Sequence, residues 1–233
     1  MKKIILFIFL FNVFSFAQVN FSKITLDKAE LRANNENKKI LIDFYTDWCI
    51  PCKELDKYIF EDSTISKYIN DNYVSLQINA ESDYGRKIGK ELNLQKAYPT
   101  VMFISSDGKE IDRIVGLIYT PNKYLQKIKD YTKNINTFSK LLEMEKSDNS
   151  DSLKYQIAIK YAERGKFKRA INYYQPLIRS KNYNLDGSIY FRIGYCYSQL
   201  GNTKKAKKYI KSAINKNPSQ KHYKEFLKEL NKK

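Results

Sequence analysis

The chain has 233 residues, with 42 lysines and arginines against 25 aspartates and glutamates and a formal net charge of +17. Beyond residues 1–17 no stretch is apolar enough to span a bilayer, which excludes a protein with several membrane spans. Three cysteines and one histidine leave no second ligand pair for a zinc site beside Cys49 and Cys52. The length supports one domain of about 110 residues and a second, smaller unit.

Residues 1–17 have the composition of an export signal. Two lysines precede an apolar run over residues 4–16, and residues 15–17 (Ser-Phe-Ala) match a small-x-small cleavage site. We therefore expect a cleavable signal peptide, a mature chain that starts at Gln18, and export to the periplasm. The alternatives are secretion, or an uncleaved segment that anchors the protein, although the run is shorter than the about 20 residues that a membrane span needs.

The motif Cys49-Ile50-Pro51-Cys52 directly follows an apolar stretch that includes residues 40–45. This order predicts a strand that leads into a helix with Cys49 at its N-terminus, where free backbone N–H groups and the helix dipole favour a thiolate. Cys52 comes one turn later, within reach of a disulfide bond to Cys49. Pro51 fits the first turn because it has no N–H that would need a partner there. The two cysteines are therefore predicted to be a thiol-disulfide exchange couple, with Cys49 as the attacking sulfur.

Three features accompany this motif: an acid at Asp43, a proline at Pro99 before an apolar run, and a hairpin pattern over residues 107–116. Together with the motif they resemble the thioredoxin superfamily over roughly residues 22–133. The resemblance implies an α/β domain at residues 18–133 with the thioredoxin-like fold, in which a central mixed sheet is flanked by helices.

The resemblance also implies roles for individual residues. In thioredoxins the acid at the position of Asp43 is buried and handles protons for the second cysteine, here Cys52. The proline at the position of Pro99 is in cis there and, with the residue at Tyr98, presents backbone to an extended substrate. Further substrate contacts are expected from the residues around the motif, Trp48, Ile50 and Pro51.

Within the superfamily, residues 45–55 (Tyr-Thr-Asp-Trp-Cys-Ile-Pro-Cys-Lys-Glu-Leu) are most similar to the C-terminal periplasmic domain of the bacterial thiol:disulfide interchange reductase. The strand expected at residues 73–79 has no lysine to lie beside Asp43, so a buried Asp43 is expected to have a raised pKa. Pro51 and the lack of a histidine between the cysteines favour reduction of protein disulfides over their formation.

The positive charge is concentrated in the C-terminal part of the chain. Residues 151–233 carry 20 Lys and Arg against 5 Asp and Glu, whereas residues 18–150 carry 20 of each. The electrostatic field of this excess positive charge is expected to attract an acidic protein or an anionic envelope surface. The alternative is a solvated helix face. Nucleic-acid binding is not expected, because an exported protein rarely meets nucleic acid.

The same region contains an internal repeat, in which Tyr161, Gly165 and Ala170 recur 36 residues later. The spacing resembles the tetratricopeptide repeat, so an all-α domain of antiparallel helix pairs is predicted. A helix with Phe138 is expected to pack against the repeats from the N-terminal side. The expected parts are a helical linker at residues 134–150, a weaker copy at residues 151–184, a better copy at residues 187–220 and a capping helix at residues 221–233.

Two classes of function remain. The first is an exported thiol-disulfide oxidoreductase that needs no cofactor, acts on protein thiol or disulfide clients, receives electrons from an upstream donor and uses the repeats to select partners. The second is a scaffold or chaperone-like protein in which the repeats carry the essential function. The complete set of motif residues favours the enzyme. Cys196 is expected to pack in a helix core rather than act as a third redox thiol, and His222 to lie on the surface.

Overall fold

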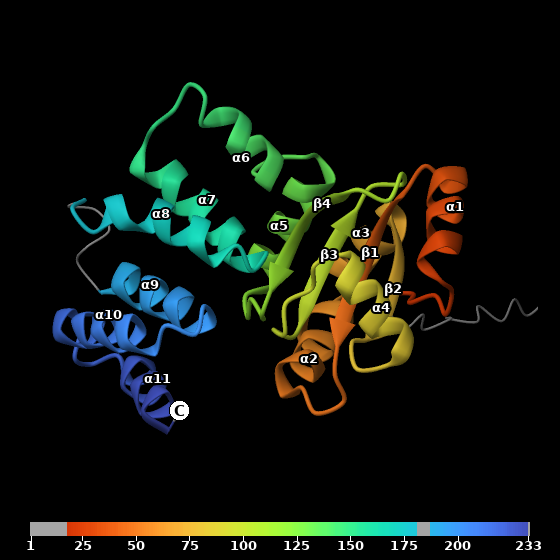
Figure 1. The fold of residues 1–233 in the computed structure, drawn as a ribbon. Helices are drawn as coiled ribbons and strands as arrows, with labels where there is room; N and C mark the ends of the chain where they lie inside the picture. Colours follow the sequence, from red (N-terminus) through yellow and green to blue (C-terminus); the bar gives the residue numbers. More distant parts are fainter. Residues whose placement is uncertain (1–17, 181–186, 233) are drawn as a thin grey trace, which may run out of the picture.

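The computed structural model describes residues 18–180 and 187–232, and it divides into an α/β part and a helical part that lie side by side (Figure 1). The predicted signal peptide, residues 1–17, lies outside the described residues. None of the helices in the described ranges has the length and apolar character to cross a bilayer.

The α/β part is built on a four-stranded mixed sheet. Strand β1 (Lys39–Tyr45) pairs in parallel with β2 (Tyr73–Asn79) and antiparallel with β3 (Thr100–Ile104), which in turn pairs antiparallel with β4 (Glu110–Val115), so the order is β2-β1-β3-β4. This is the predicted thioredoxin-like fold, and β3 and β4 form the hairpin expected from the sequence.

Helices cover both faces of the sheet, which explains why residues 40–44 of β1 are all buried. Because side chains alternate along a strand, Leu41 packs on one face and Ile40 and Ile42 on the other. The face of Leu41 is covered by α2 (Ile50–Leu55), the π-helical turn η1 (Asp56–Phe60), α3 (Ser63–Asn72) and α5 (Pro121–Thr132). The opposite face is covered by α1 (Leu26–Glu36) and α4 (Asp83–Glu91).

The C-terminal part is a stack of helices with two hydrophobic clusters. It consists of α6 (Phe138–Met144), α7 (Asp151–Glu163), α8 (Phe167–Leu177), α9 (Ser188–Gln199), α10 (Thr203–Lys216) and α11 (Lys221–Lys232). The larger cluster extends over α6–α9 and the smaller one over α10 and α11. Phe138 and Leu141 of α6 join the core of the first helix pair, as expected. Residues 181–184 of the weaker predicted copy lie outside the described residues.

Glycines occupy the positions that let the repeat helices turn and pack. Gly165 and Gly201, 36 residues apart, both have positive φ (68° and 74°) in the turns within the two helix pairs, a conformation that L side chains rarely adopt. Gly194 lies against α10 so closely that a Cβ there would be 2.7 Å from Ile210 Cδ1. The repeat spacing therefore reflects backbone geometry and close helix contact.

The two parts are joined by buried ion pairs that the sequence did not reveal. Asp112 of β4 accepts from Lys160 of α7 at 2.7 Å and from Arg164, the C-cap of α7, at 2.9 Å, and Arg164 also reaches Glu110 at 2.8 Å. Not all of the C-terminal excess of positive charge is therefore on the surface. The linker region is a part of this junction too, because the Phe138 N–H at the start of α6 donates to Asp112.

Candidate functional site

The two motif cysteines lie where β1 passes into α2. Cys49 is the N-cap of α2, and its N–H donates to the Thr46 carbonyl at 3.1 Å. The N–H of Cys52 points back at Cys49 Sγ, with 3.2 Å between the two atoms. Pro51 lies in the first turn of α2. A negative charge on Cys49 Sγ would thus face a backbone donor and the positive end of the helix dipole.

Cys49 and Cys52 form a disulfide bond, with 5.3 Å between their Cα atoms. Their exposed fractions are only 2% and 4%, whereas the neighbouring Trp48 and Ile50 are 65% and 69% exposed. Pro51 is exposed as well. The sulfurs are therefore recessed beneath apolar side chains that an incoming polypeptide would touch first.

The predicted substrate-contact residues Trp48, Tyr98 and Pro99 lie together beside the disulfide-bearing turn. The rings of Trp48 and Tyr98 meet edge to face with centroids 6.1 Å apart, and Trp48 Nε1 donates to Glu81 at 3.1 Å. The Tyr98-Pro99 bond is cis, as expected, and the Pro99 carbonyl accepts from the N–H of Gly116 at 2.8 Å. These contacts connect four separate segments of the chain, and Pro99 itself is buried.

Asp43 is buried in the middle of β1, with 1% of its surface exposed. One carboxylate oxygen accepts from Gln77 Nε2 at 3.1 Å, and the other has no hydrogen-bond partner. Burial raises the pKa of Asp43 to about 7; the Gln77 hydrogen bond opposes the rise, and the charge of Asp56 adds to it. A carboxyl group with a pKa near neutrality can both accept and return a proton at working pH.

Gln77 links Asp43 to a second acid. The same Nε2 atom donates to Asp56 of η1 at 3.0 Å, so one amide serves two carboxylates. Gln77 is directly opposite Asp43 in the parallel register of β1 and β2. The sequence showed that no lysine was available on this strand, but only the register identifies which residue faces Asp43.

Other titratable groups have different environments. Cys196 is buried in the helical core, and burial raises the pKa of its thiol to about 12, which favours packing over redox chemistry. His222 is exposed, with its ring 5.1 Å from that of Phe191. No cluster of three or more His, Cys, Asp or Glu residues within the described ranges could ligate a metal ion.

Comparison with known proteins divides the chain as the structure does. Residues 26–132 match the family of thioredoxin-like domains, and residues 187–220 match the tetratricopeptide repeat. The chain is 34% identical over 97 residues to "Thiol:disulfide interchange protein DsbD" of Salmonella typhi, a match that covers 40% of this chain and 17% of that protein. The protein of the same name from Photorhabdus laumondii is 34% identical over 84 residues, or 35% and 14% of the two chains. This chain thus spans only a small share of the length of these relatives.

Part of the chain is also similar to two solved structures. A proposed disulphide-isomerase from Bacteroides thetaiotaomicron is 35% identical, with a TM-score of 0.45, and the match covers 49% of this chain and 93% of that one. The C-terminal domain of DsbD from Neisseria meningitidis, in its oxidised form, is 22% identical with a TM-score of 0.39, and the match covers 45% and 90%. The family relationships predicted for both parts of the chain are confirmed by the two family matches.

Proposed function

We propose that the protein is a thiol-disulfide oxidoreductase, since residues 26–132 belong to the thioredoxin-like family. It reduces disulfides in client proteins through Cys49 and Cys52. The observation that carries this proposal is the placement of Cys49 at the N-cap of α2, in a disulfide bond with Cys52. The buried Asp43 supplies a carboxyl group whose pKa of about 7 suits proton transfer to and from a thiol.

In the reaction, the Cys49 thiolate of the reduced protein attacks one sulfur of the client disulfide. The bond between the two client sulfurs breaks, the sulfur that was not attacked leaves as a thiolate, and Cys49 is joined to the attacked sulfur in a mixed disulfide. Cys52 then passes its proton toward Asp43 and attacks Cys49 Sγ, which releases the second client thiolate. The client gains two electrons, and the protein is left with the Cys49–Cys52 disulfide, which an upstream donor must reduce.

Three further parts of the proposal concern place, direction and partners. The composition of residues 1–17 supports export, and the periplasm is the compartment in which such a couple would meet protein disulfides. Pro51 in the spacer supports reduction as the direction. The tetratricopeptide match at residues 187–220 and the C-terminal charge support recruitment of acidic clients or an anionic envelope surface by the helical part. A pure scaffold would have no use for the arrangement of Cys49, Cys52 and Asp43.

The proposal is tested by assaying reduction of a protein disulfide, such as those of insulin, with dithiothreitol as electron donor. Cys49→Ser should abolish the protein-dependent rate, and Cys52→Ala should accumulate a mixed disulfide that only added reductant releases. Lys140→Gln is the control and should keep the full rate, because Lys140 is exposed on α6, away from the cysteines. A Cys52→Ala protein that turns over normally would contradict the assignment of Cys52 as the resolving thiol.

A further inference from the structure

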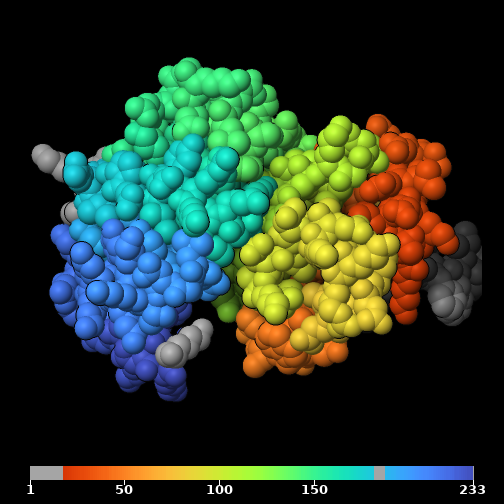
Figure 2. Space-filling model, in the orientation of Figure 1, coloured from red at the N-terminus to blue at the C-terminus, as the bar shows by residue number. Residues whose placement is uncertain are grey.

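A cavity of about 570 Å³ lies between the α/β part and the inner side of the helical part. Figure 2 shows this face of the molecule hollowed between the C-terminal helices (blue) and the N-terminal part (yellow and orange). One wall is the loop of residues 95–97, and the other comes from α7, α8, α9 and α11. We call it the interdomain groove.

The interdomain groove begins beside the redox site. Its wall residue Ala97 directly precedes Tyr98, whose ring contacts Trp48 next to Cys49. Val115, another wall residue, directly precedes Gly116, which donates to the carbonyl of Pro99. A polypeptide that places a cysteine over Cys49 and runs past the cis-proline is therefore led toward the groove.

The groove is held open by contacts between the two parts of the chain. The side chain of Gln95 lies over the α7–α8 turn, where a Cβ on Gly165 would be 2.3 Å from its Oε1 atom. Arg113 of β4, itself 1% exposed, donates to the carbonyls of Leu92 and Asn93 at 2.9 and 3.1 Å. Glu110 forms ion pairs with both Arg113 and Arg164. The loop before the cis-proline is therefore connected to the end of α7 through the hydrogen bonds of Arg113 and these ion pairs. Such a groove needs little reorganisation to bind a ligand.

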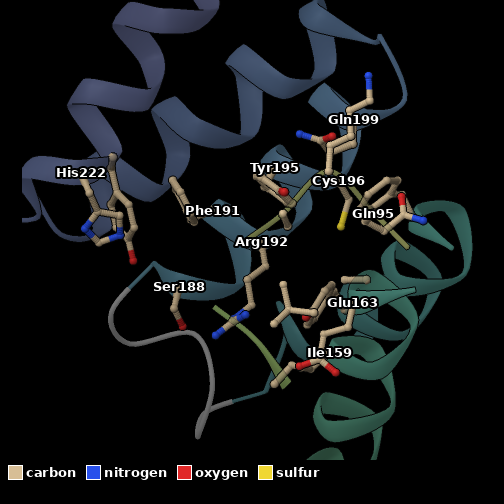
Figure 3. Close-up of a pocket in the computed structure, with 17 residues that line it drawn as sticks. Gln95, Ile159, Glu163, Ser188, Phe191, Arg192, Tyr195, Cys196, Gln199 and His222 are labelled. Carbon is tan, nitrogen blue, oxygen red and sulfur yellow. The ribbon is translucent and has the colours of Figure 1, made fainter. Parts of the chain in front are cut away.

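The lining of the groove combines aromatic rings with positive charge. Figure 3 shows Arg192 extending from α9 toward the cavity, near Phe191, with Glu163 and Ile159 of α7 on the facing side. Arg192 lies over the ring of Tyr155 and is hydrogen-bonded to the side chains of Tyr155 and Tyr174. Among the described residues, neither Arg192 nor Lys96 forms an ion pair with a carboxylate. Glu163 lies 3.9 Å from Lys160, and burial raises the pKa of its carboxyl group, which disfavours a negative charge there. The groove is thus apolar and cationic.

We propose that the interdomain groove binds the stretch of client polypeptide that adjoins the reactive cysteine, and that it selects an extended stretch with an aromatic side chain and a carboxylate. The inference rests on the proposed function, because the client must first place a sulfur over Cys49. Phe191 and Tyr195 supply the surface for the aromatic side chain. Arg192 and Lys96 supply the charge that a carboxylate complements.

The test uses the full chain carrying Cys52→Ala, so that only the attack by Cys49 is measured. Short peptides, each with one cysteine linked to thionitrobenzoate, report the attack by release of that chromophore. A Tyr-Glu segment is placed on the N-terminal side of the cysteine in one peptide and on the C-terminal side in another. Each has a partner peptide with Lys in place of Glu and a second with Ala in place of Tyr.

For one of the two placements, the Tyr-Glu peptide should react about tenfold faster than its Lys partner, since two cations face the carboxylate. This ratio should fall to about twofold or less in Lys96→Glu and in Arg192→Gln. The ratio between the Tyr and Ala peptides should fall in Phe191→Ala. Lys87→Glu changes the net charge as Lys96→Glu does, but on α4 and outside the groove, and should leave both ratios unchanged.

The outcomes separate the two proposals. Failure of the Cys52→Ala protein to release thionitrobenzoate from the small symmetrical disulfide of that compound would contradict the proposed function. Normal release from that compound, with peptide ratios near one for both placements, would overturn the proposal that the groove binds the client and would leave the proposed function intact. The groove proposal would also be overturned if the ratio between the Tyr-Glu peptide and its Lys partner stayed unchanged in both Lys96→Glu and Arg192→Gln. If Arg192→Gln fails to fold, judged by circular dichroism, the exposed Lys96→Glu decides.

Discussion

Lys160 Nζ lies 2.7 Å from Asp112 Oδ2, and the exposed fractions of the two side chains are 6% and 0%. The pair joins α7 of the helical part to β4 of the α/β part. Asp112 also accepts from Arg164 and from the N–H of Phe138, so its carboxylate has a partner on each side. The two parts of the chain therefore share a buried electrostatic centre.

Loss of Asp112 should destabilise the folded chain more than loss of either partner. Asp112→Ala leaves two buried cations without their shared carboxylate and is expected to cost about 3–5 kcal/mol of unfolding free energy. Lys160→Met should cost less, because Asp112 keeps Arg164. The control is Lys140→Met, which breaks an exposed pair with Glu143 and should cost less than about 1 kcal/mol. Urea unfolding of the full chain measures all three, and equal losses would contradict the ranking.

Asp43 should make stability depend on pH. Its pKa is about 7 in the folded protein against an ordinary value of 3.8, so between these limits the folded state holds a proton that the unfolded state has lost. The unfolding free energy should therefore fall as pH rises from about 4 to 7, by on the order of 4 kcal/mol in total. Asp43→Asn removes this slope and should be more stable than the wild type at pH 8.

The measurement is urea unfolding of the oxidised protein between pH 4 and pH 8. The matched control is Asp47→Asn, which removes an exposed carboxylate near the same turn and should keep the wild-type slope. Parallel pH profiles for Asp43→Asn and the wild type would show that Asp43 does not titrate in this range.

Gln77 should set the pH at which the mixed disulfide resolves. Its hydrogen bond stabilises the Asp43 carboxylate, so Gln77→Met should raise the pKa of Asp43 further, whereas Asp56→Asn removes a repelling charge and should lower it. The midpoint of the pH profile for release of the client thiol is expected to move in opposite directions in these two variants. Movement in the same direction would indicate that Asp43 is not the proton acceptor.

The three cysteines of the reduced protein should differ in reactivity. A helix N-terminus favours the thiolate of Cys49, whereas burial raises the pKa of the Cys196 thiol to about 12. Iodoacetamide at neutral pH should modify Cys49 at least about a hundredfold faster than Cys196, with Cys52 slower than Cys49. Mass spectrometry of timed samples gives the rates. Similar rates at all three sites would refute the assignment of the nucleophile.

Recruitment by the helical part should depend on salt. The basic residues of α10, Lys204, Lys205, Lys207 and Lys208, would steer an acidic client, and exposed charges are screened beyond about 8 Å at physiological ionic strength. The association rate should fall with added salt, and replacement of these four lysines by Gln should lower it while Cys49 reactivity is retained. An association rate that is independent of salt and unaffected by the four substitutions would indicate that these lysines are only a solvated helix face.

The local chemistry of the site and the classes of both parts of the chain follow from the sequence alone. The Cys49-Ile50-Pro51-Cys52 motif after an apolar strand determines a helix N-cap, because caps and first turns depend on residues within one turn of each other. The repeat of Gly165 at Gly201 determines the helix pairs in the same way, since each positive-φ turn is a local requirement.

Contacts between distant residues were decided by the tertiary structure. Gln77 reaches Asp43 from 34 positions away because β2 pairs with β1 in one particular register. Asp112 and Lys160 are 48 positions apart and belong to different parts of the chain, so no periodicity in the sequence connects them. The interdomain groove depends on this junction, because a surface formed between two parts exists only once their packing fixes the angle at which they meet.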